Sequence, residues 1–212
     1  MSQTSNAYPV NLSIDYPDRN LNKLTTFFRI ITVIPIFIVS GLLFGSNGNQ
    51  GDITGGWSYQ YSAAGYVLLP LILMLLFRQK YPQWWFDWNV ALVKFSTRVG
   101  AYIHLLTDEY PSTDEDQMVH IEIAYPDVKN DLNRWLPLVK WLLAIPHYII
   151  LFFLSIAAIV CLVIAWFAIL FTGRYPRGLF DFVVSVYRWS LRVVSYAFLL
   201  TTDRYPPFAL SS

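Results

Sequence analysis

Charge is scarce in this sequence of 212 residues. Only 14% of its residues are Asp, Glu, Lys or Arg, against about 25% in soluble globular domains. The formal net charge of +1 argues against a nucleic-acid-binding protein driven by overall positive charge. Because 55% of the residues are hydrophobic, the composition also excludes intrinsic disorder. A chain with so little charge is typical of a protein that lies partly in lipid.

Cysteine is nearly absent, and the common catalytic motifs are missing altogether. Cys161 is the single cysteine, so the chain can form neither an internal disulfide nor a cluster of thiolate ligands. The H-E-x-x-H, G-x-S-x-G, C-x-x-C, Walker and dinucleotide-binding glycine patterns do not occur. We therefore expect no enzymatic activity and no cofactor. His104 and His147 could ligate haem or a metal, but we favour packed polar roles because the other half of the chain has no matching histidines.

Long uncharged stretches predict transmembrane helices. Residues 27–44 and 57–77 are each long enough to cross about 30 Å of hydrocarbon, and the Gly- and Asn-rich segment between them predicts a hairpin. Residues 141–173 carry no charge; we interpret them as two shorter spans that turn near Ser155, with one long helix as the alternative. The expected total is about four transmembrane helices. Since residues 45–62 contain no Lys or Arg, the positive-inside rule predicts a multi-pass protein with both termini in the cytoplasm.

The two halves of the chain are tandem copies. The sequence VNLSIDYPD from Val10 aligns with VHIEIAYPD from Val119, and KYPQWWFDW from Lys80 aligns with RYPRGLFDF from Arg174. We therefore predict repeat 1 over residues 1–112 and repeat 2 over residues 113–212. Each repeat is expected to contain a strand, a transmembrane hairpin and an amphipathic helix.

Each repeat begins with a predicted strand and ends with a predicted helix. Apolar residues alternate with polar ones after Val10 and after Val119, which predicts two short cytoplasmic β-strands that pair with each other or with a partner. Residues 84–106 and 179–200 have helical periodicity with one polar stripe, which favours amphipathic helices in the membrane interface. The alternative is that these two helices cross the membrane, in an inverted duplication like those of some transporters. The predicted fold class is an all-α integral membrane protein, with the strands as its only sheet.

Two pairs of basic residues are the candidate lipid site. Lys94 and Arg98 in repeat 1, and Arg188 and Arg192 in repeat 2, place like charges four residues apart on a helix, which is locally repulsive. Anionic phospholipid headgroups would compensate for this repulsion, and ordinary interfacial positions are the equally weighted alternative. Pro35 and Pro146 occupy matching positions and are candidates for helix kinks. No metal site is expected.

Recurring Tyr-Pro pairs and the block RYPRGLFDFVVSVYRW from Arg174 resemble a family of bacterial integral membrane proteins known only as a domain of unknown function, DUF4389. The resemblance extends over both halves of the chain. It implies a location in the bacterial cytoplasmic (inner) membrane, and it implies no substrate, cofactor or catalytic residue.

Two functional hypotheses follow from the sequence. The first is a non-enzymatic accessory or scaffold subunit of a larger membrane complex that contacts anionic lipid. The alternative is a small transporter or lipid-handling protein with a site between the two repeats. The expected partners are membrane lipids, together with other membrane protein subunits or further copies of the chain, and not nucleic acid.

Overall fold

The computed structural model describes residues 8–17, 20–44, 70–113, 115 and 117–210. The protein is mostly helical (60%) and contains a two-stranded antiparallel sheet. The elements in chain order are β1 (Val10–Ile14), α1 (Lys23–Phe27), α2 (Arg29–Phe44), the π-helical turn η1 (Met74–Arg78), α4 (Gln83–Ile103), β2 (Val119–Ile123), the 3-10 turn η2 (Leu136–Leu138), α5 (Lys140–Leu143), α6 (Ile145–Thr172) and α7 (Arg177–Ala197).

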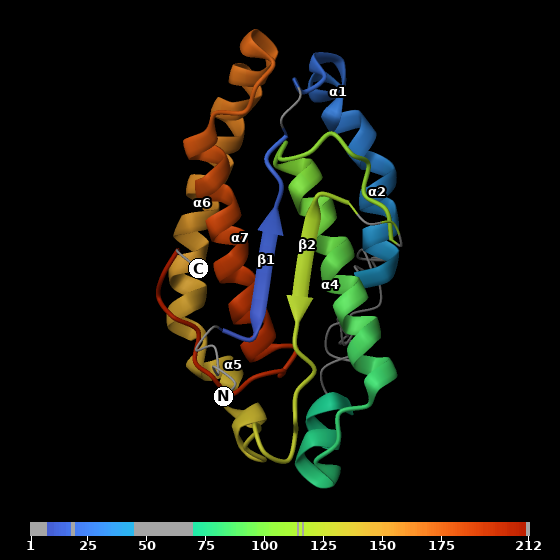
Figure 1. The fold of residues 1–212 in the computed structure, drawn as a ribbon, viewed down its shortest axis with the longest axis vertical. Coiled ribbons are helices and arrows are strands. Elements are labelled where there is room, and N and C mark those ends of the chain that lie inside the picture. Colours follow the sequence, from blue (N-terminus) through green and yellow to red (C-terminus); the bar gives the residue numbers. More distant parts are fainter. Residues whose placement is uncertain (1–7, 18–19, 45–69, 114, 116, 211–212) are drawn as a thin grey trace, which may run out of the picture.

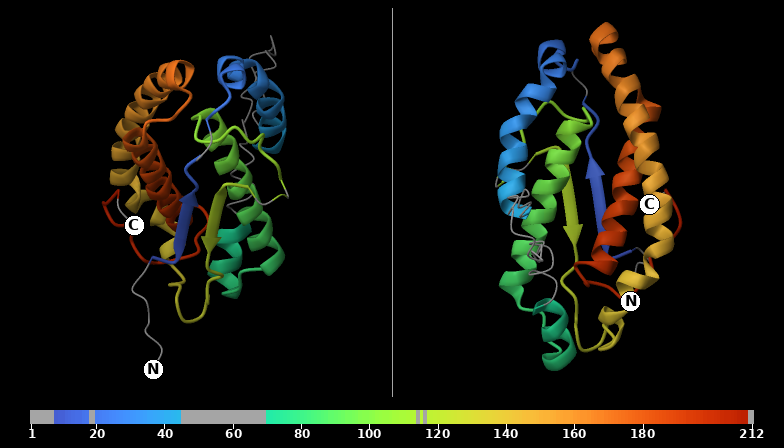
Figure 2. Two further views of the ribbon diagram at one scale, coloured as in Figure 1. Left: turned by 45° about the horizontal axis from the view of Figure 1, so that its top comes forward. Right: turned by 180° about the vertical axis from the view of Figure 1, so that it is seen from behind.

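The strands and the long helices run along the long axis of the molecule (Figure 1). Helices α4 and α7 flank the sheet, with β1 packed on α7 and β2 packed on α4. Helix α2 packs on α4, and α6 packs on α7, each on the side away from the sheet (Figures 1 and 2). The molecule therefore has three layers: the sheet, then α4 and α7, then α2 and α6.

The two strands are those predicted from the sequence, and they pair with each other. Leu12 lies opposite Ile121, and the pairs on either side are Val10 with Ile123 and Ile14 with Val119. Because Leu12 and Ile121 occupy the same position in the two repeats, this register is symmetric. A pseudo-two-fold axis thus passes through the Leu12–Ile121 pair and relates the two strands.

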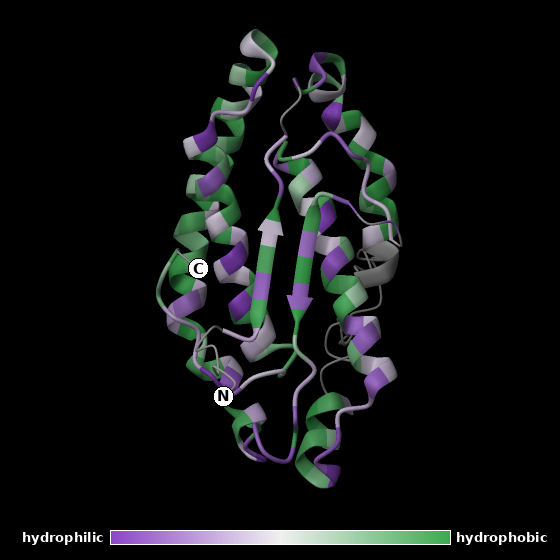
Figure 3. Ribbon diagram, viewed as in Figure 1, coloured by the Kyte–Doolittle hydropathy of each residue, from purple (hydrophilic) through white to green (hydrophobic). Residues whose placement is uncertain are grey.

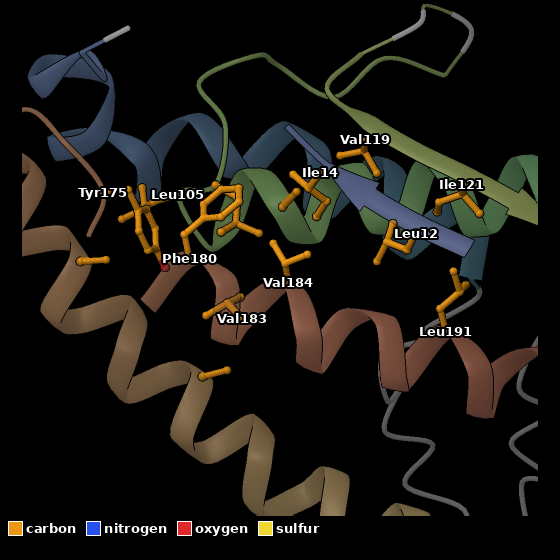
Figure 4. Close-up of a cluster of buried hydrophobic side chains, with 14 of the residues drawn as sticks. Leu12, Ile14, Leu105, Val119, Ile121, Tyr175, Phe180, Val183, Val184 and Leu191 are labelled. Atoms are coloured by element: carbon orange, nitrogen blue, oxygen red, sulfur yellow. The ribbon is translucent and has the colours of Figure 1, made fainter. Parts of the chain in front are cut away.

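Each strand packs on the amphipathic helix of the other repeat. In the largest buried cluster of the described residues, Leu12 of β1 faces Leu191 of α7, and Ile14 of β1 faces Val184 of α7 (Figure 4). A two-stranded sheet is marginal in water without such support. In this arrangement each strand receives its support from the amphipathic helix of the other repeat. The repeats are interlocked rather than side by side.

The recurring tyrosines fasten this exchange. The hydroxyl of Tyr16 in repeat 1 donates a hydrogen bond to the carbonyl of Tyr175 in repeat 2, and the hydroxyl of Tyr125 in repeat 2 donates to the carbonyl of Tyr81 in repeat 1. Tyr81 and Tyr175 are themselves buried, and each is followed by a proline that immediately precedes α4 or α7. The Tyr-Pro pairs therefore set where the amphipathic helices begin and which strand docks there.

A buried ion pair recurs in the two repeats. Arg29 at the start of α2 lies 2.7 Å from Asp108, and Lys140 at the start of α5 lies 2.7 Å from Asp203. Both basic side chains are buried, and a charge buried without a partner would be strongly destabilising. Each pair therefore locks the beginning of one apolar segment to the loop that follows the amphipathic helix of the same repeat.

Two further contacts complete each of these buried ion pairs. A threonine carbonyl accepts a hydrogen bond from the basic group, at 2.9 Å for Thr107 and 2.8 Å for Thr202. A tyrosine ring also lies under the cation, with Arg29 3.9 Å from the centre of Tyr102 and Lys140 5.2 Å from the centre of Tyr196. Such cation–π contacts stabilise a desolvated cation. The Thr-Asp sequence is thus a repeated receptor for a buried cation.

Helix α6 corrects the predicted hairpin over residues 141–173. The helix continues without interruption from Ile145 to Thr172, so the predicted turn near Ser155 is wrong and the alternative of one long helix is right. The hydroxyl of Ser155 donates to the carbonyl of Phe152 at 2.8 Å, which satisfies this polar group within the helix. The long uncharged run therefore forms one continuous helix, whose backbone hydrogen bonds need no turn.

The described residues contain one helix, α6, that is long and apolar enough to cross a membrane. The predicted total of four spans and the multi-pass arrangement are therefore not supported. Residues 27–44 are helical as predicted, except that α1 ends and α2 begins around Phe28. The predicted loop at residues 45–61 and most of the predicted span at residues 57–77 lie outside the described residues.

Gly100 is needed where α4 meets α7. A Cβ atom at this position would overlap the hydroxyl of Tyr187 and lie 3.1 Å from two of its ring carbons. We expect Gly100→Ala to lower the free energy of unfolding by about 1–2 kcal/mol, because the overlap outweighs the better helix propensity of alanine. Gly178→Ala, where a Cβ would meet nothing within 4 Å, is the matched control. Denaturant unfolding in detergent measures both, and equal stability of the two variants would contradict the close contact.

Candidate functional site

A groove of about 1350 Å³ lies between α4 and α7, beside the sheet. Its apolar lining comes from both strands, including Leu12 and Ile121, and from Val90 and Leu191 on the two helices. The strand residues Leu12 and Ile121 belong to the buried cluster that also contains residues of α6, so the groove lies on the helix side of the sheet. The groove is therefore formed by both repeats together.

Four basic side chains line the same groove. They are Lys94 on α4, Arg188 and Arg192 on α7, and Arg204 after α7, and Glu122 is the one acidic residue among the groove residues of the described chain. Four cations against one carboxylate give the groove a positive potential. An apolar surface next to several cations is the chemistry that binds an amphipathic anion.

Hydrogen bonds to main-chain carbonyls hold the arginines in place. Arg188 donates from Nε to the carbonyl of Leu12 at 2.8 Å, and Arg192 donates to the carbonyl of Ala209 at 3.3 Å. Burial lowers the pKa of the Arg192 guanidinium, and the neighbouring charge of Arg188 lowers it further, against an opposing effect of Tyr8. This mutual repulsion favours binding of an anion between the two groups.

Lys94 is the least constrained cation of the groove. Its ammonium group makes no hydrogen bond or ion pair with the described part of the chain. Lys94 corresponds to Arg188 in the duplication, so the two repeats contribute one equivalent cation each to opposite walls. An ammonium on a flexible stem can follow a ligand that a fixed guanidinium has positioned.

The structure brings together three of the four basic residues proposed from the sequence. Arg98 does not line the groove; it is buried, and its guanidinium donates to the carbonyl of Ser112 at 2.9 Å. A similar contact joins Arg192 to the carbonyl of Ala209 in the loop after α7. Arg98 therefore holds the loop after α4, and only its counterpart in repeat 2 reaches the groove.

Arg204 is the groove residue that sequence reasoning missed. The signal was present in the duplication, because TDEYP in repeat 1 becomes TDRYP in repeat 2. Arg204 stands where repeat 1 has Glu109, so the charge is reversed between two otherwise identical segments. The difference in charge between the repeats singles out Arg204, although only the structure places it in the groove.

The proposed kink prolines lie away from the groove. Pro35 lies inside α2, and Pro146 lies in the first turn of α6, where a proline is well tolerated because its missing N–H has no helical partner. Neither residue lines the groove. Their proposed role as helix kinks stays a prediction.

The two histidines make contacts with side chains of α7. Nδ1 of His104 lies 2.9 Å from the hydroxyl of Tyr187 and 3.0 Å from the carbonyl of Gly100, and burial lowers the pKa of His104. Nδ1 of His147 accepts a hydrogen bond from the indole of Trp189 at 3.0 Å, and Phe208 stacks on the imidazole. Within the described residues, no group of three or more His, Cys, Asp or Glu could hold a metal ion.

Residues 135–209 match the family model described as Domain of unknown function (DUF4389). The match extends from η2 through α6 and α7 and includes the buried ion pair of Lys140 with Asp203. It confirms the family resemblance over this part of repeat 2. No curated protein and no solved structure matches the chain.

Proposed function

We propose that this protein, which carries a DUF4389 domain at residues 135–209, is a non-enzymatic membrane-associated protein that binds an anionic phospholipid headgroup in the groove between its repeats. The observation that carries the proposal is the convergence of Lys94, Arg188, Arg192 and Arg204 on one apolar groove. Each basic group near an anionic lipid contributes about 1 kcal/mol. Together these residues distinguish an anionic headgroup from a zwitterionic one.

The position of the groove favours one of the two hypotheses drawn from the sequence. Its walls and floor come from both halves of the chain, as expected for a lipid-handling protein with a site between the repeats. An accessory subunit that contacts lipid only at its surface needs no such groove. Membership of a larger complex remains a separate proposal, and the groove does not depend on it.

The proposal is tested by the binding of short-chain lipids to the full chain in an uncharged detergent. Dioctanoyl phosphatidylglycerol should bind more tightly than dioctanoyl phosphatidylcholine, as measured by tryptophan fluorescence. Lys94→Gln should weaken binding of the phosphatidylglycerol about fivefold, the factor that corresponds to about 1 kcal/mol. Arg188→Gln should weaken it at least as much, because this side chain is fixed against Leu12.

Lys80→Gln and Lys129→Gln are the charge-matched controls, because both side chains are exposed and lie outside the groove. These variants should bind phosphatidylglycerol like the wild type. Equal affinity for the two lipids, or equal weakening by the controls, would contradict the headgroup site. Glycerol phosphate separates a lipid from a free phosphate: if it binds as tightly as the lipid, the apolar lining contributes nothing and the lipid assignment is wrong.

A further inference from the structure

Helix α6 presents an almost uncovered apolar surface. Only 11% of its most apolar 18-residue stretch is buried within the protein. The side chains of Phe153, Val160 and Phe171 are 64%, 54% and 80% exposed. Figure 3 shows α6 coloured mainly as hydrophobic along its length, whereas α7 alternates between hydrophobic and hydrophilic residues. On the other side of the molecule, α2 likewise exposes Ile31 and Phe37. An exposed apolar surface along a helix of 28 residues fits lipid acyl chains.

The layers of the fold conflict with an α6 that crosses the membrane. Because α6 runs alongside α7 and the strands (Figure 1), a crossing α6 would place these elements at the depth of the hydrocarbon. The charged groups of Arg188 and Lys94 would then lie within the bilayer, as would the exposed side chains of Asn11 and Glu122 on the sheet. Charges at that depth are expensive, and open sheet edges do not occur in contact with lipid.

The distribution of basic residues gives the same answer independently. Lys129, Arg134 and Lys140 precede α6, and Arg174 and Arg177 follow it. Segments rich in Lys and Arg stay on the cytoplasmic side of a bacterial membrane. If α6 crossed the membrane once, one of these two groups of basic residues would lie outside the cytoplasm. If α6 does not cross, both groups lie on the cytoplasmic side.

We propose that α6 and α2 lie in the plane of the membrane, within one leaflet, and that neither helix crosses it. The three layers then correspond to three depths: α2 and α6 contact acyl chains, α4 and α7 lie at the headgroups, and the sheet faces the cytoplasm. The pseudo-two-fold axis through Leu12 and Ile121 runs along the membrane normal. Both repeats therefore contact the same leaflet, as parallel repeats do.

This orientation rests on the layers and on the charges at the ends of α6, and not on the groove. It also gives the groove a source of ligand, since the walls α4 and α7 would lie at headgroup depth. The two proposals fail separately. If the orientation is wrong, the measured depth of α6 will differ from the expected depth. If the ligand is wrong, only the measured preference between lipid headgroups will differ.

Depth-dependent fluorescence quenching tests the orientation. Phe153, Val160 and Phe171 lie on one face of α6, at intervals of 7 and 11 residues, and 18 residues of helix extend over about 27 Å. Single cysteines at these exposed positions, in a Cys161→Ala background, are labelled with an environment-sensitive dye. The full-length chain is then reconstituted into vesicles of phosphatidylcholine and phosphatidylglycerol that carry bromine at a shallow or a deep acyl position.

An α6 that lies in the plane predicts the same ratio of shallow to deep quenching at all three positions. A crossing α6 predicts deep quenching at Val160 and shallow quenching at Phe171, which would overturn the proposal. Absence of quenching at all three positions would also overturn it, because protein rather than lipid would then cover α6. Since all three side chains are exposed, the substitutions leave the packing of the fold unchanged.

Discussion

Replacing Lys140 by alanine should lower the free energy of unfolding by about 3–5 kcal/mol, the range observed when one partner of a buried ion pair is removed. The ammonium group of Lys140 is fully buried, lies 2.7 Å from a carboxylate oxygen of Asp203 and donates to the carbonyl of Thr202. Without it, the charge of Asp203 and the carbonyl lose their partner together. Denaturant unfolding of the purified protein in detergent measures the loss.

Lys129→Ala is the matched control, because Lys129 is exposed and lies in the segment between β2 and η2. It should change the unfolding free energy by less than about 0.5 kcal/mol. The double variant Lys140→Met with Asp203→Asn should be less destabilised than the sum of its single variants, because the two side chains interact directly. Additive effects would show that the ion pair makes no contribution of its own.

The duplication is visible in the sequence, but the pairing of the buried charges is not. When the two halves are aligned, Arg29 matches Lys140 and TDEYP matches TDRYP. Both partners of the ion pair are therefore visible as residues that recur in the two repeats. Their pairing is not visible, because 79 residues separate Arg29 from Asp108 and no local periodicity connects them. The sequence therefore gives no sign that both basic side chains are buried.

The sequence predicts those basic residues of the groove that share one face of a single helix. Helical periodicity places Arg188 and Arg192 on one polar stripe, and both line the groove. The same periodicity selects Arg98, which instead holds the loop at Ser112. The difference arises after the helices end, where the loop of repeat 2 brings Arg204 to the groove. Such tertiary detail leaves no periodic signal.

The membrane prediction was limited by a different ambiguity. An uncharged run of the length of α6 fits two short spans, one tilted span, or one helix in the plane, because hydropathy reports composition and not direction. The decisive information is which elements lie beside the helix. It comes from the exchange of strands between the repeats, which places polar groups alongside α6.

Replacing Leu12 by alanine tests that exchange, and its expected effect is comparably large. Leu12 is 2% exposed and packs in the cluster that includes Leu191 of α7, so its truncation should lower the free energy of unfolding by about 2–5 kcal/mol. Ser13→Ala is the matched control, because Ser13 points to the opposite, partly exposed face of the sheet. It should be close to neutral.

Hydrogen exchange locates the damage caused by Leu12→Ala. Although Leu12 belongs to repeat 1, the strand β1 packs on α7 of repeat 2, so protection should fall in β2 and in α7 while α2 keeps its protection. If the strands instead packed within their own repeats, protection would fall in α4 and not in α7. In the interlocked arrangement, the symmetric variant Ile121→Ala should lower protection in α4 and leave α7 protected. Ile121 is equivalent to Leu12 across the pseudo-two-fold axis, and its strand β2 packs on α4. Only interlocked repeats place the damage of each substitution in the amphipathic helix of the other repeat, and interlocked repeats are what hold the two walls of the groove together.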